Sequence, residues 1–254
     1  MLEFQNVTVS LGKNTILNNI SFSVPDRKLT VLLGKNGAGK TTLANCLFGQ
    51  QKYSGNILLN NKDIRKESTD ELAKHLSLLP QLLPCPNITV RELVAFGRSP
   101  YMGIQHRLTK QDICAVEEAI VLADCVTIRD RYLPSLSGGE RQKAFLAMTL
   151  AQQTNLIVLD EPTTYMDAVA ESDFLNLLQA LTQQGKTVIL ILHNLSLAVK
   201  YADQIVILDN GRCGFSGTKD VCLDRQEIEN TFHVLRFDAV CNGEREIFFS
   251  ADTK

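Results

Sequence analysis

The sequence predicts an α/β protein in which helices cover both faces of a mostly parallel sheet and a helical lobe is inserted into that core. Short apolar runs at residues 156–159, 188–192 and 205–208 have the length and composition of buried strands. A helical stretch at 168–184 joins the first two runs, and such alternation is typical of parallel sheets. Between residues 81 and 135 the pattern changes to helices, which predicts the inserted lobe.

The composition is that of an ordinary globular protein, because 44% of the 254 residues are hydrophobic and 21% are charged. This length suits one large domain or a core with an inserted lobe. A formal net charge of −2 does not indicate a broad basic surface for nucleic acid. Seven cysteines without a C-x-x-C pair suit a reduced cytosolic protein. The longest apolar run, at 188–192, is too short to span a bilayer.

The N-terminal region is rich in predicted strands, at residues 2–11, 20–24 and 29–33. The third strand runs into a glycine-rich loop and then into a helix, which Gly49 is placed to end. The tail after about residue 234 is predicted to form a hairpin around the Asn-Gly pair at 242–243.

Residues 34–41 follow the pattern G-x-x-x-x-G-K-T. Glycines in such a loop let successive N–H groups turn inward around a polyphosphate, and the helix start adds the positive end of its dipole. Lys40 would reach the β- and γ-phosphates, and the Thr41 hydroxyl would be a ligand of Mg²⁺. A glycine-rich turn that matches by chance is the alternative, but the position between a strand and a helix favours a nucleotide site.

The run LIVLDE at residues 156–161 predicts a buried strand that ends in two carboxylates. The end of a parallel strand opens into the crevice where ligands bind. Asp160 would hold Mg²⁺ through water there, and Glu161 would orient and deprotonate the attacking water. Because Pro162 follows, the two acids could instead begin a helix, but the phosphate loop upstream favours the catalytic interpretation.

Gln81 and His193 also stand at the predicted ends of strands, after LSLL and VILIL. Their positions favour side chains near the same crevice. An ordinary hydrogen-bonded residue is the alternative for each of them, and spacing alone does not decide between the two interpretations.

The predicted lobe contains clear helix starts. Thr89 and Glu92 form a capping-box pattern for a helix that ends at Gly97. A second helix is predicted to start near Thr109 and to share one apolar face among Ile113, Val116, Ile120 and Ala123. A third follows LPSLSGGE at 133–140, where two adjacent glycines expose N–H groups without an obvious acceptor.

With these motifs in order, the sequence resembles the ATP-binding-cassette (ABC) ATPase subunits over almost its whole length, to about His233. The matching motifs are the phosphate loop, the Q-loop glutamine, the signature LSGGE, the acidic strand LIVLDE, the D-loop aspartate in TTYMD and the switch histidine. Many NTPases share the phosphate loop, but its combination with a signature shortly before the acidic strand is specific to this family.

The resemblance implies a P-loop NTPase (RecA-like) core with an N-terminal antiparallel β subdomain and an inserted α-helical subdomain. It places an ABC ATPase domain at residues 1–235, with the core at 1–84 and 154–235 and the helical subdomain with the signature at 85–153. A C-terminal extension of unknown role would occupy residues 236–254.

The resemblance also implies a role for each site residue. The catalytic residues would be Glu161, His193, Lys40 and Gln81. ATP would be bound by Gly34, Lys35, Asn36, Gly37, Ala38, Gly39, Lys40, Thr41 and Thr42. Mg²⁺ would be held by Thr41, Gln81 and, through water, Asp160. ATP held by a second copy in a two-fold dimer would meet the signature and D-loop residues Leu136, Ser137, Gly138, Gly139, Glu140 and Asp167.

Within the family, the sequence is similar to ATPases of type II importers for ferric siderophores, haem and cobalamin. The stretch LSLLPQLLPCPNITVRELVAFGRSPYMG resembles the ferric siderophore branch, and the chain looks closest to ferric citrate-type subunits. This likeness implies ATP hydrolysis coupled to transport through separate integral membrane permease subunits. Residues 90–107 would line the groove for a permease helix, and Gln81 would link nucleotide state to that partner.

The same likeness implies a periplasmic or surface substrate-binding protein as an indirect partner and no nucleic-acid partner. It places the chain peripherally on the cytoplasmic face of the inner membrane. A non-transport ABC ATPase of repair or translation type is the alternative. Repair-type proteins contain long heptad helices, and translation-type proteins contain two cassettes in one chain; this sequence shows neither feature. A small-molecule kinase that uses the same loop would leave LSGGE unexplained.

Three residues depart from the family pattern. Leu11 stands where an aromatic side chain stacks on adenine, and the loss of stacking would weaken base recognition by about 1 kcal/mol. Glu140 replaces the commoner glutamine and would repel phosphate unless it points to the ribose or pairs with Arg141. Asn194 stands where aspartate is usual, which would change the orientation of His193.

Overall fold

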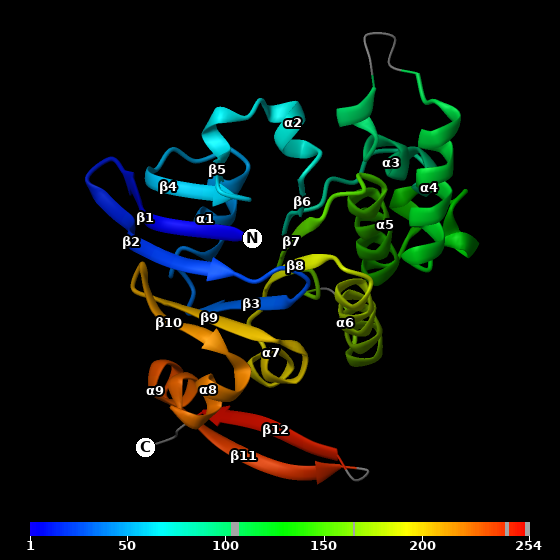
Figure 1. Cartoon of the computed structure of the whole chain (residues 1–254). Helices are drawn as coiled ribbons and strands as arrows, with labels where there is room; N and C mark the ends of the chain where they lie inside the picture. Colours follow the sequence, from blue (N-terminus) through cyan, green and yellow to red (C-terminus); the bar gives the residue numbers. More distant parts are fainter. Residues whose placement is uncertain (103–106, 165, 242–243, 252–254) are drawn as a thin grey trace. The chain divides into compact units, whose positions relative to one another are not determined.

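The computed structural model describes residues 1–102, 107–164, 166–241 and 244–251, and the chain folds into two compact units. The first unit comprises Met1–Glu67 and Thr187–Lys254, and the second comprises Ser68–Lys186 (Figure 1). Both contain helices and strands, as the predicted α/β class requires. The predicted domain bounds, at residues 84, 154 and 235, divide the chain by motif and stay a prediction.

Four strands of the first unit form an antiparallel sheet in the order β2-β1-β4-β5. They are β1 (Leu2–Leu11), β2 (Asn14–Val24), β4 (Ser54–Leu59) and β5 (Lys62–Asp63), and the 3₁₀ turn η1 (Ile64–Lys66) follows. Phe4 of β1 stacks on Phe22 of β2 with 4.5 Å between the ring centroids. Strand β2 begins earlier than predicted because its polar first half still pairs with β1, with Asn19 at a φ of 56° beside a register shift.

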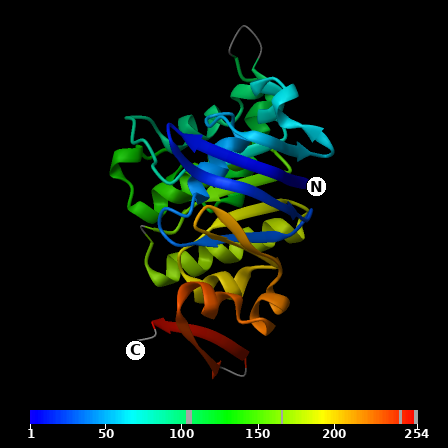
Figure 2. The ribbon, with the colours of Figure 1, turned by 90° about the vertical axis from the view of Figure 1, so that its left-hand side faces the viewer.

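A second sheet of the first unit carries the predicted phosphate loop. Strand β3 (Leu29–Gly34) lies between the parallel strands β8 (Thr187–Ile191) and β9 (Gln204–Asp209), and β10 (Arg212–Thr218) pairs antiparallel with β9. Every residue of β3 and β8 is buried, as expected for strands with both faces covered. Helices α1 (Lys40–Leu47) and α7 (Leu195–Tyr201) contact β3 from opposite sides (Figures 1 and 2).

The first unit ends in two short helices and a hairpin (Figure 1). Helices α8 (Lys219–Asp224) and α9 (Glu227–Phe232) lead into the antiparallel strands β11 (Val234–Cys241) and β12 (Glu244–Ala251). These strands confirm the predicted hairpin, whose turn at 242–243 lies outside the described residues. Strand β12 lies against α7, where the Phe249 N–H donates to Ser196 Oγ at 3.3 Å.

Apolar side chains remain exposed on this hairpin. Phe237 and Phe248 stand directly opposite each other across the two strands and are 51% and 42% exposed. Leu235 and Val240 are exposed as well. The hairpin therefore presents more apolar surface to solvent than a strand pair of a covered sheet.

The second unit combines two parallel strands with helices. Strand β6 (Leu76–Leu79) pairs with β7 (Leu156–Asp160), and α2 (Thr69–Ala73) precedes β6. Helices α3 (Val90–Phe96), α4 (Lys110–Leu122) and α5 (Gly138–Ala151) pack on one another, and α6 (Ala168–Gln183) follows β7. The shorter 3₁₀ turns are η2 (Ser99–Tyr101), η3 (Val126–Ile128) and η4 (Leu133–Ser135).

The helix starts of the lobe are those that the sequence predicts. Thr89 and Glu92 form a reciprocal capping box at α3, and Thr109 and Asp112 form another at α4. The predicted apolar face of α4 is wrong at Ile113, which is 50% exposed. Asp112 takes the buried position in that first turn instead, because its carboxylate caps the helix and pairs with an arginine described below.

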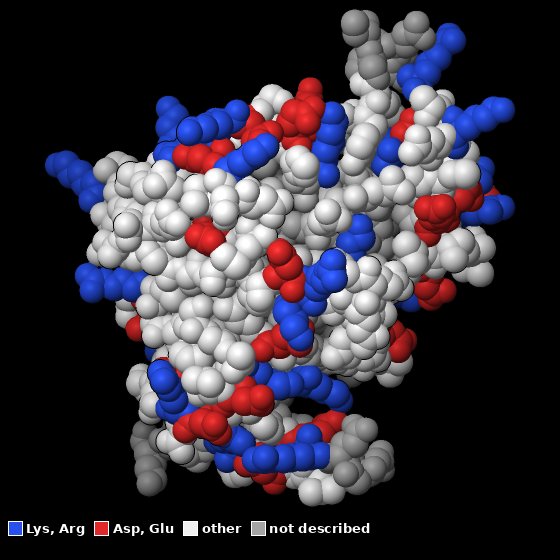
Figure 3. All heavy atoms as spheres, in the orientation of Figure 1, with Lys and Arg blue, Asp and Glu red and all other residues white. Residues whose placement is uncertain are grey.

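Charges of both signs are interspersed over the face drawn in Figure 3, so neither sign dominates that face.

The cysteines whose side chains are described form no disulfide. In the described part of the chain, no helix has the combined length and apolar character needed to cross a bilayer.

Candidate functional site

The phosphate loop of the first unit leaves β3 at Gly34 and enters α1 at Lys40. A Cβ at Gly34 would lie 2.7 Å from the carbonyl oxygen of Leu208, so the backbone of β9 passes too close for a side chain. Gly39 has a φ of +98°, and a Cβ there would overlap the side chain of Leu17 in β2. Strands β9 and β2 therefore approach the loop too closely for a side chain at Gly34 or Gly39, and glycine fits at both positions.

The side chain of Lys40 is buried within its own loop. Its Nζ donates to the carbonyl oxygens of Gly34 at 2.8 Å and of Lys35 at 3.4 Å. Gly39 occupies the N-cap position of α1 and has no side chain to cap the helix. The start of α1, with Thr41 exposed in its first turn, thus offers N–H donors and a positive dipole end to an anion.

His193 and its neighbour lie where β8 passes into α7. His193 is exposed, and Asn194 caps α7 by accepting a hydrogen bond from the N–H of Leu197 at 3.2 Å. An amide oxygen accepts this bond as a carboxylate oxygen would, so asparagine in place of aspartate still caps α7. Leu11, the other departure in this unit, ends β1 with an exposed aliphatic side chain.

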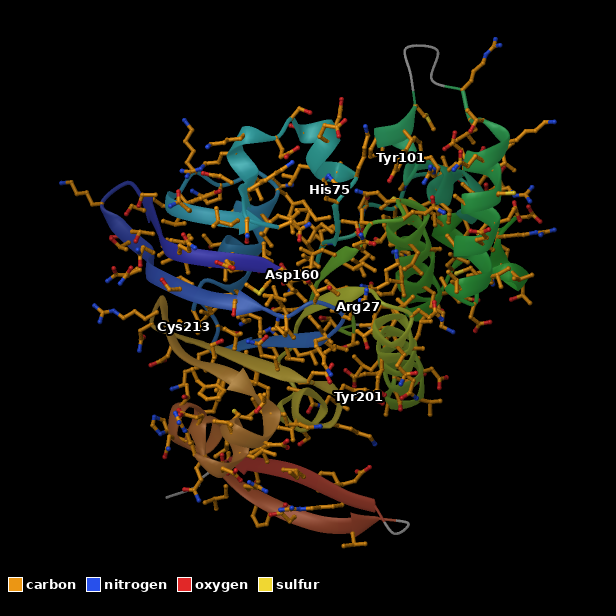
Figure 4. All side chains as sticks on the ribbon, viewed as in Figure 1. Arg27, His75, Tyr101, Asp160, Tyr201 and Cys213 are labelled. Carbon is orange, nitrogen blue, oxygen red and sulfur yellow. The ribbon has the colours of Figure 1, made fainter. Side chains whose placement is uncertain are left out.

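In the second unit, the acidic pair stands at the end of β7 (Figure 4 labels Asp160). Asp160 is buried, and Glu161 follows in a left-handed backbone conformation with a φ of +50°. Such a conformation is uncommon for a residue with a Cβ and is often found at functional sites. Gln81 Nε2 donates to Glu161 Oε2 at 2.6 Å, so the fold brings together two predicted catalytic residues that stand 80 positions apart.

The signature begins helix α5, as the sequence predicts. Ser137 caps the helix: its Oγ accepts from the N–H of Glu140 at 3.2 Å, while Glu140 Oε2 accepts from the N–H of Ser137 at 2.8 Å. The N–H of Ser137 therefore has its acceptor in a carboxylate three residues later. Within the described part of the chain, the hydrogen bonds include no acceptor for the N–H groups of Gly138 and Gly139.

Glu140 is held from two sides. Hydrogen bonds from the Ser137 N–H and then the Ser137 hydroxyl, followed by the charge of Arg131, keep the pKa of this carboxyl below its ordinary value in spite of partial burial. Arg131 Nη1 lies 2.8 Å from Glu140 Oε1. Arg141, which the sequence offers as one possible partner of Glu140, donates instead to the Leu136 carbonyl at 3.4 Å. Sequence reasoning missed Arg131 because the turn η4 separates it from the helix and no helical spacing connects the two residues.

The D-loop aspartate caps the next helix. Asp167 Oδ1 accepts from the N–H groups of Val169 at 3.1 Å and of Ala170 at 2.9 Å. A Cβ built on Gly139 would lie 3.9 Å from the Ala170 Cβ, so the signature and the start of α6 lie side by side in the second unit. Tyr165, in the D-loop motif, lies outside the described residues.

The lobe also contains a buried ion pair that sequence reasoning missed. Arg98 Nε lies 2.8 Å from Asp112 Oδ1, with only 3% and 5% of the two side chains exposed. The same guanidinium donates to the carbonyl oxygen of Ala151 at 2.8 Å and stacks 3.9 Å from the ring centroid of Tyr101, which Figure 4 labels. These contacts join α4 to the end of α5.

The buried position affects the titration of Asp112. Burial would raise its pKa, but hydrogen bonds from Thr109 and Arg98 outweigh burial and hold the pKa below the ordinary value of 3.8. Arg98 lies in the region predicted to receive a permease helix, residues 90–107, of which 103–106 lie outside the described residues.

The predicted ligands of Mg²⁺ are all oxygen donors: the Thr41 hydroxyl, the Gln81 amide oxygen and the Asp160 carboxylate. Mg²⁺ prefers such donors, and in nucleotide sites it takes one or two from protein and the rest from phosphate and water. No group of three His, Cys, Asp or Glu side chains in the described ranges could hold a metal ion. The chemistry of these three oxygen donors fits Mg²⁺.

Comparison with known proteins identifies the family. Residues 17–164 match the family of ABC transporters. The chain is 37% identical over 233 residues to the achromobactin transport ATP-binding protein CbrD of Dickeya dadantii, covering 91% of this chain and 87% of that protein. It is 36% identical over 218 residues to the hemin import ATP-binding protein HmuV of Rhodococcus jostii, covering 85% and 74%. The chain belongs to the ABC transporter family.

A solved structure shares the fold. A metal-chelate type ABC transporter in an inward-facing conformation matches 100% of this chain and 98% of its own matching chain, with a TM-score of 0.87 at 24% identity. The predicted P-loop fold with an antiparallel β subdomain and a helical subdomain is thereby confirmed. The chain is an ABC transporter ATPase, an enzyme whose ATP hydrolysis is coupled to transport.

Proposed function

We propose that this ATPase drives bacterial uptake of an iron(III)-siderophore, of the ferric citrate type, through a separate membrane permease. The observation that carries this proposal is the similarity, over most of both chains, to an achromobactin transport ATP-binding protein. Haem is a competing cargo, because a protein named for hemin import is almost as similar. Cobalamin is the third candidate, from the resemblance to type II importers alone.

Each site residue has a proposed role in hydrolysis. Lys40 leaves the carbonyl oxygens of its loop to neutralise the β- and γ-phosphates, which the N–H groups of residues 34–42 surround. Thr41 and, through water, Asp160 would hold Mg²⁺, which when bound would withdraw charge from the phosphates. Glu161 removes a proton from the attacking water, and His193 acts as the switch histidine beside the γ-phosphate.

Gln81 has two proposed positions. In the structure its amide donates to the carboxylate oxygen of Glu161, so the proposed base already accepts a hydrogen bond. In its second position Gln81 would be a ligand of Mg²⁺, and Glu161 Oε2 would then accept one hydrogen bond fewer and could take a proton from water. Residues 90–107 follow Gln81 in the chain, and a permease helix bound there would favour one position over the other.

The signature and D-loop act on ATP held by a second copy, in a two-fold dimer that completes both sites. The N–H groups of Gly138 and Gly139 and the Ser137 hydroxyl proton are the proposed donors to the γ-phosphate. Leu136, Glu140 and Asp167 support them from the same surface. Donors that are already in place stabilise the charge of phosphoryl transfer without reorganisation.

The proposed location is the cytoplasmic face of the inner membrane. The chain would be a peripheral subunit there, attached through the permease, and a periplasmic or surface binding protein would deliver the cargo. Nucleic acid is not a proposed partner.

Cargo uptake in a strain that lacks the gene tests the proposal. We expect loss of uptake of ⁵⁵Fe presented as the ferric citrate or achromobactin complex, with haem and cobalamin uptake unchanged. The wild-type gene should restore uptake, and a gene encoding Glu161→Gln should not. Loss of haem or cobalamin uptake alone would reject the siderophore. Normal uptake of all cargoes, with the protein bound to DNA or ribosomes in a salt-dependent manner, would favour the non-transport alternative.

Hydrolysis by the purified protein tests the assigned base. We expect Glu161→Gln to lower turnover by about 100- to 1,000-fold, because a positioned proton acceptor is lost. ATP binding should survive and should produce a stable dimer in size-exclusion chromatography. Glu118→Gln, which changes an exposed carboxylate on α4, is the matched control. Full activity of the Glu161 variant would contradict the assignment.

A further inference from the structure

The glutamate of the signature creates an electrostatic conflict. Glu140 lies in the first turn of α5, the helix whose start would receive a γ-phosphate under the proposed function. Its negative charge opposes that of the phosphate and offsets the attraction of the helix dipole. A binding surface for phosphate that contains a carboxylate needs a cation to cancel it.

Arg131 supplies that cation in a fixed geometry. Its Nη1 lies 2.8 Å from Glu140 Oε1, and its Nη2 donates to the carbonyl oxygen of Ser135 at 2.7 Å. One guanidinium therefore holds both the carboxylate and the backbone that leads into the signature. A planar guanidinium makes two such directed hydrogen bonds, whereas an ammonium acts as a point charge.

The backbone of Arg131 is fixed as well. Its N–H donates to the carbonyl oxygen of Ile128 at 2.9 Å, and its own carbonyl oxygen accepts from the N–H of Val90 at 3.0 Å. Val90 is the first residue of α3, so the guanidinium extends from a segment that α3 anchors. The cation is thus held at both ends.

The neighbouring arginine does not take this role. Arg141 directs its Nη2 to the Leu136 carbonyl at 3.4 Å. In the part of the chain that the structure describes, the ion pairs of Glu140 involve Arg131. The Ser137 hydroxyl oxygen accepts from the Glu140 N–H at 3.2 Å, so the carboxylate that Arg131 holds belongs to the cap of α5.

We propose that Arg131 is a positioning residue of the signature: it neutralises Glu140 and keeps it in the helix cap, so that the start of α5 can receive the γ-phosphate of the second copy's ATP. This inference rests on the proposed action of the signature in trans. It explains how a chain with glutamate in place of glutamine keeps a usable signature.

Steady-state hydrolysis at varied MgATP concentrations tests Arg131. We expect Arg131→Ala to raise the KM for ATP about tenfold or more, since Glu140 then repels phosphate. In the Glu140→Gln background, the same change should alter KM by less than about twofold, because no charge needs cancelling. Arg131→Lys, which keeps the charge, should show a smaller defect than Arg131→Ala.

Matched controls separate this role from folding. Arg129→Ala removes a positive charge from an arginine two residues earlier that pairs with Glu117 and Asp130, and it should leave KM unchanged. Circular dichroism and thermal midpoints identify variants that fail to fold. If Arg131→Ala has no effect, or if the defect persists with Gln at position 140, Arg131 does not act by neutralising Glu140.

Failure of the proposed function would look different. Glu161→Gln protein that forms no dimer with MgATP would reject the site shared between two copies, whatever Arg131 does. If that protein dimerises, and Arg131→Ala in the same background dimerises at the same ATP concentration, only the inference about Arg131 is rejected.

Discussion

Gly39 shows how one residue can serve the backbone and the packing of a site at once. Its φ of +98° is a conformation that residues with a Cβ rarely adopt, and the space where a Cβ would stand is filled by Leu17. Leu17 belongs to β2, so the antiparallel sheet supports the turn into α1. The side-chain-free position lets the loop curve tightly ahead of the helix start.

Replacing Gly39 by alanine should therefore destabilise the protein through both strain and overlap. We expect a loss of about 2–4 kcal/mol in the free energy of unfolding, from about 1–2 kcal/mol of backbone strain and a similar term for overpacking. The matched control is Gly185→Ala, where φ is +94° and no atom lies within 4 Å of the added Cβ. Chemical denaturation measures both losses, and equal losses would show that Leu17 moves aside freely.

At the scale of elements, helix α4 depends on a carboxylate that performs two tasks. Asp112 caps the helix with Thr109 and pairs with Arg98, and both side chains of the ion pair are buried. Removing one partner of a buried pair leaves the other charge uncompensated, at a cost of about 3–5 kcal/mol. The packing of the helical lobe is therefore sensitive to the charge on this residue.

This dependence predicts a pH effect of definite sign. The folded pKa of Asp112 lies below its ordinary value of 3.8, so its contribution to stability is complete above that value and is lost as pH falls through the folded pKa. Asp112→Asn should unfold at a lower temperature than the wild type near neutral pH. The gap between the two thermal midpoints should narrow as pH falls from about 6 to about 3.

Asp130→Asn is the control for this measurement. The Asp130 side chain is 75% exposed, so its substitution should leave the wild-type pH profile nearly unchanged. A gap between wild type and Asp112→Asn that stayed constant across the same pH range would show that Asp112 does not titrate as described.

At the scale of the whole molecule, the sequence predicts what local patterns determine. Neighbouring residues alone determine the apolar runs of β3, β7, β8 and β9, the phosphate loop, the capping box of α3 and the start of α4 near Thr109. Gln81 and Glu161, which the sequence places near one crevice, are joined by a hydrogen bond across 80 positions. Sequence reasoning missed the ion pair between Arg131 and Glu140 because it crosses a turn. It also missed the local capping box of Ser137 and Glu140.

One wrong prediction has the same physical origin. Ile113 was expected on the buried face of α4 because apolar residues usually face a core. The ion pair with Arg98 instead makes a polar residue, Asp112, the buried member of that turn. A pattern of hydrophobicity does not reveal that a charged side chain has a buried partner elsewhere in the chain.

The exposed apolar residues of the C-terminal hairpin should make the isolated chain self-associate in concentrated solution. Its opposed residues Phe237 and Phe248 are both largely exposed. We expect Phe237→Thr, which retains a strand-forming residue, to reduce self-association in light scattering. Val121→Thr, at an exposed position on α4, is the control and should have little effect. Equal light scattering by the wild type and the Phe237 variant would show that the hairpin does not mediate self-association.

These exposed apolar residues of the hairpin have a larger effect on self-association because the whole chain carries a formal net charge of only −2. Molecules with so little like charge repel one another weakly, and added salt screens the remainder within about 10 Å. Whether the free subunit stays dispersed then depends on how often the hairpins of two molecules collide. Dilution, rather than a change of ionic strength, should keep the free subunit dispersed.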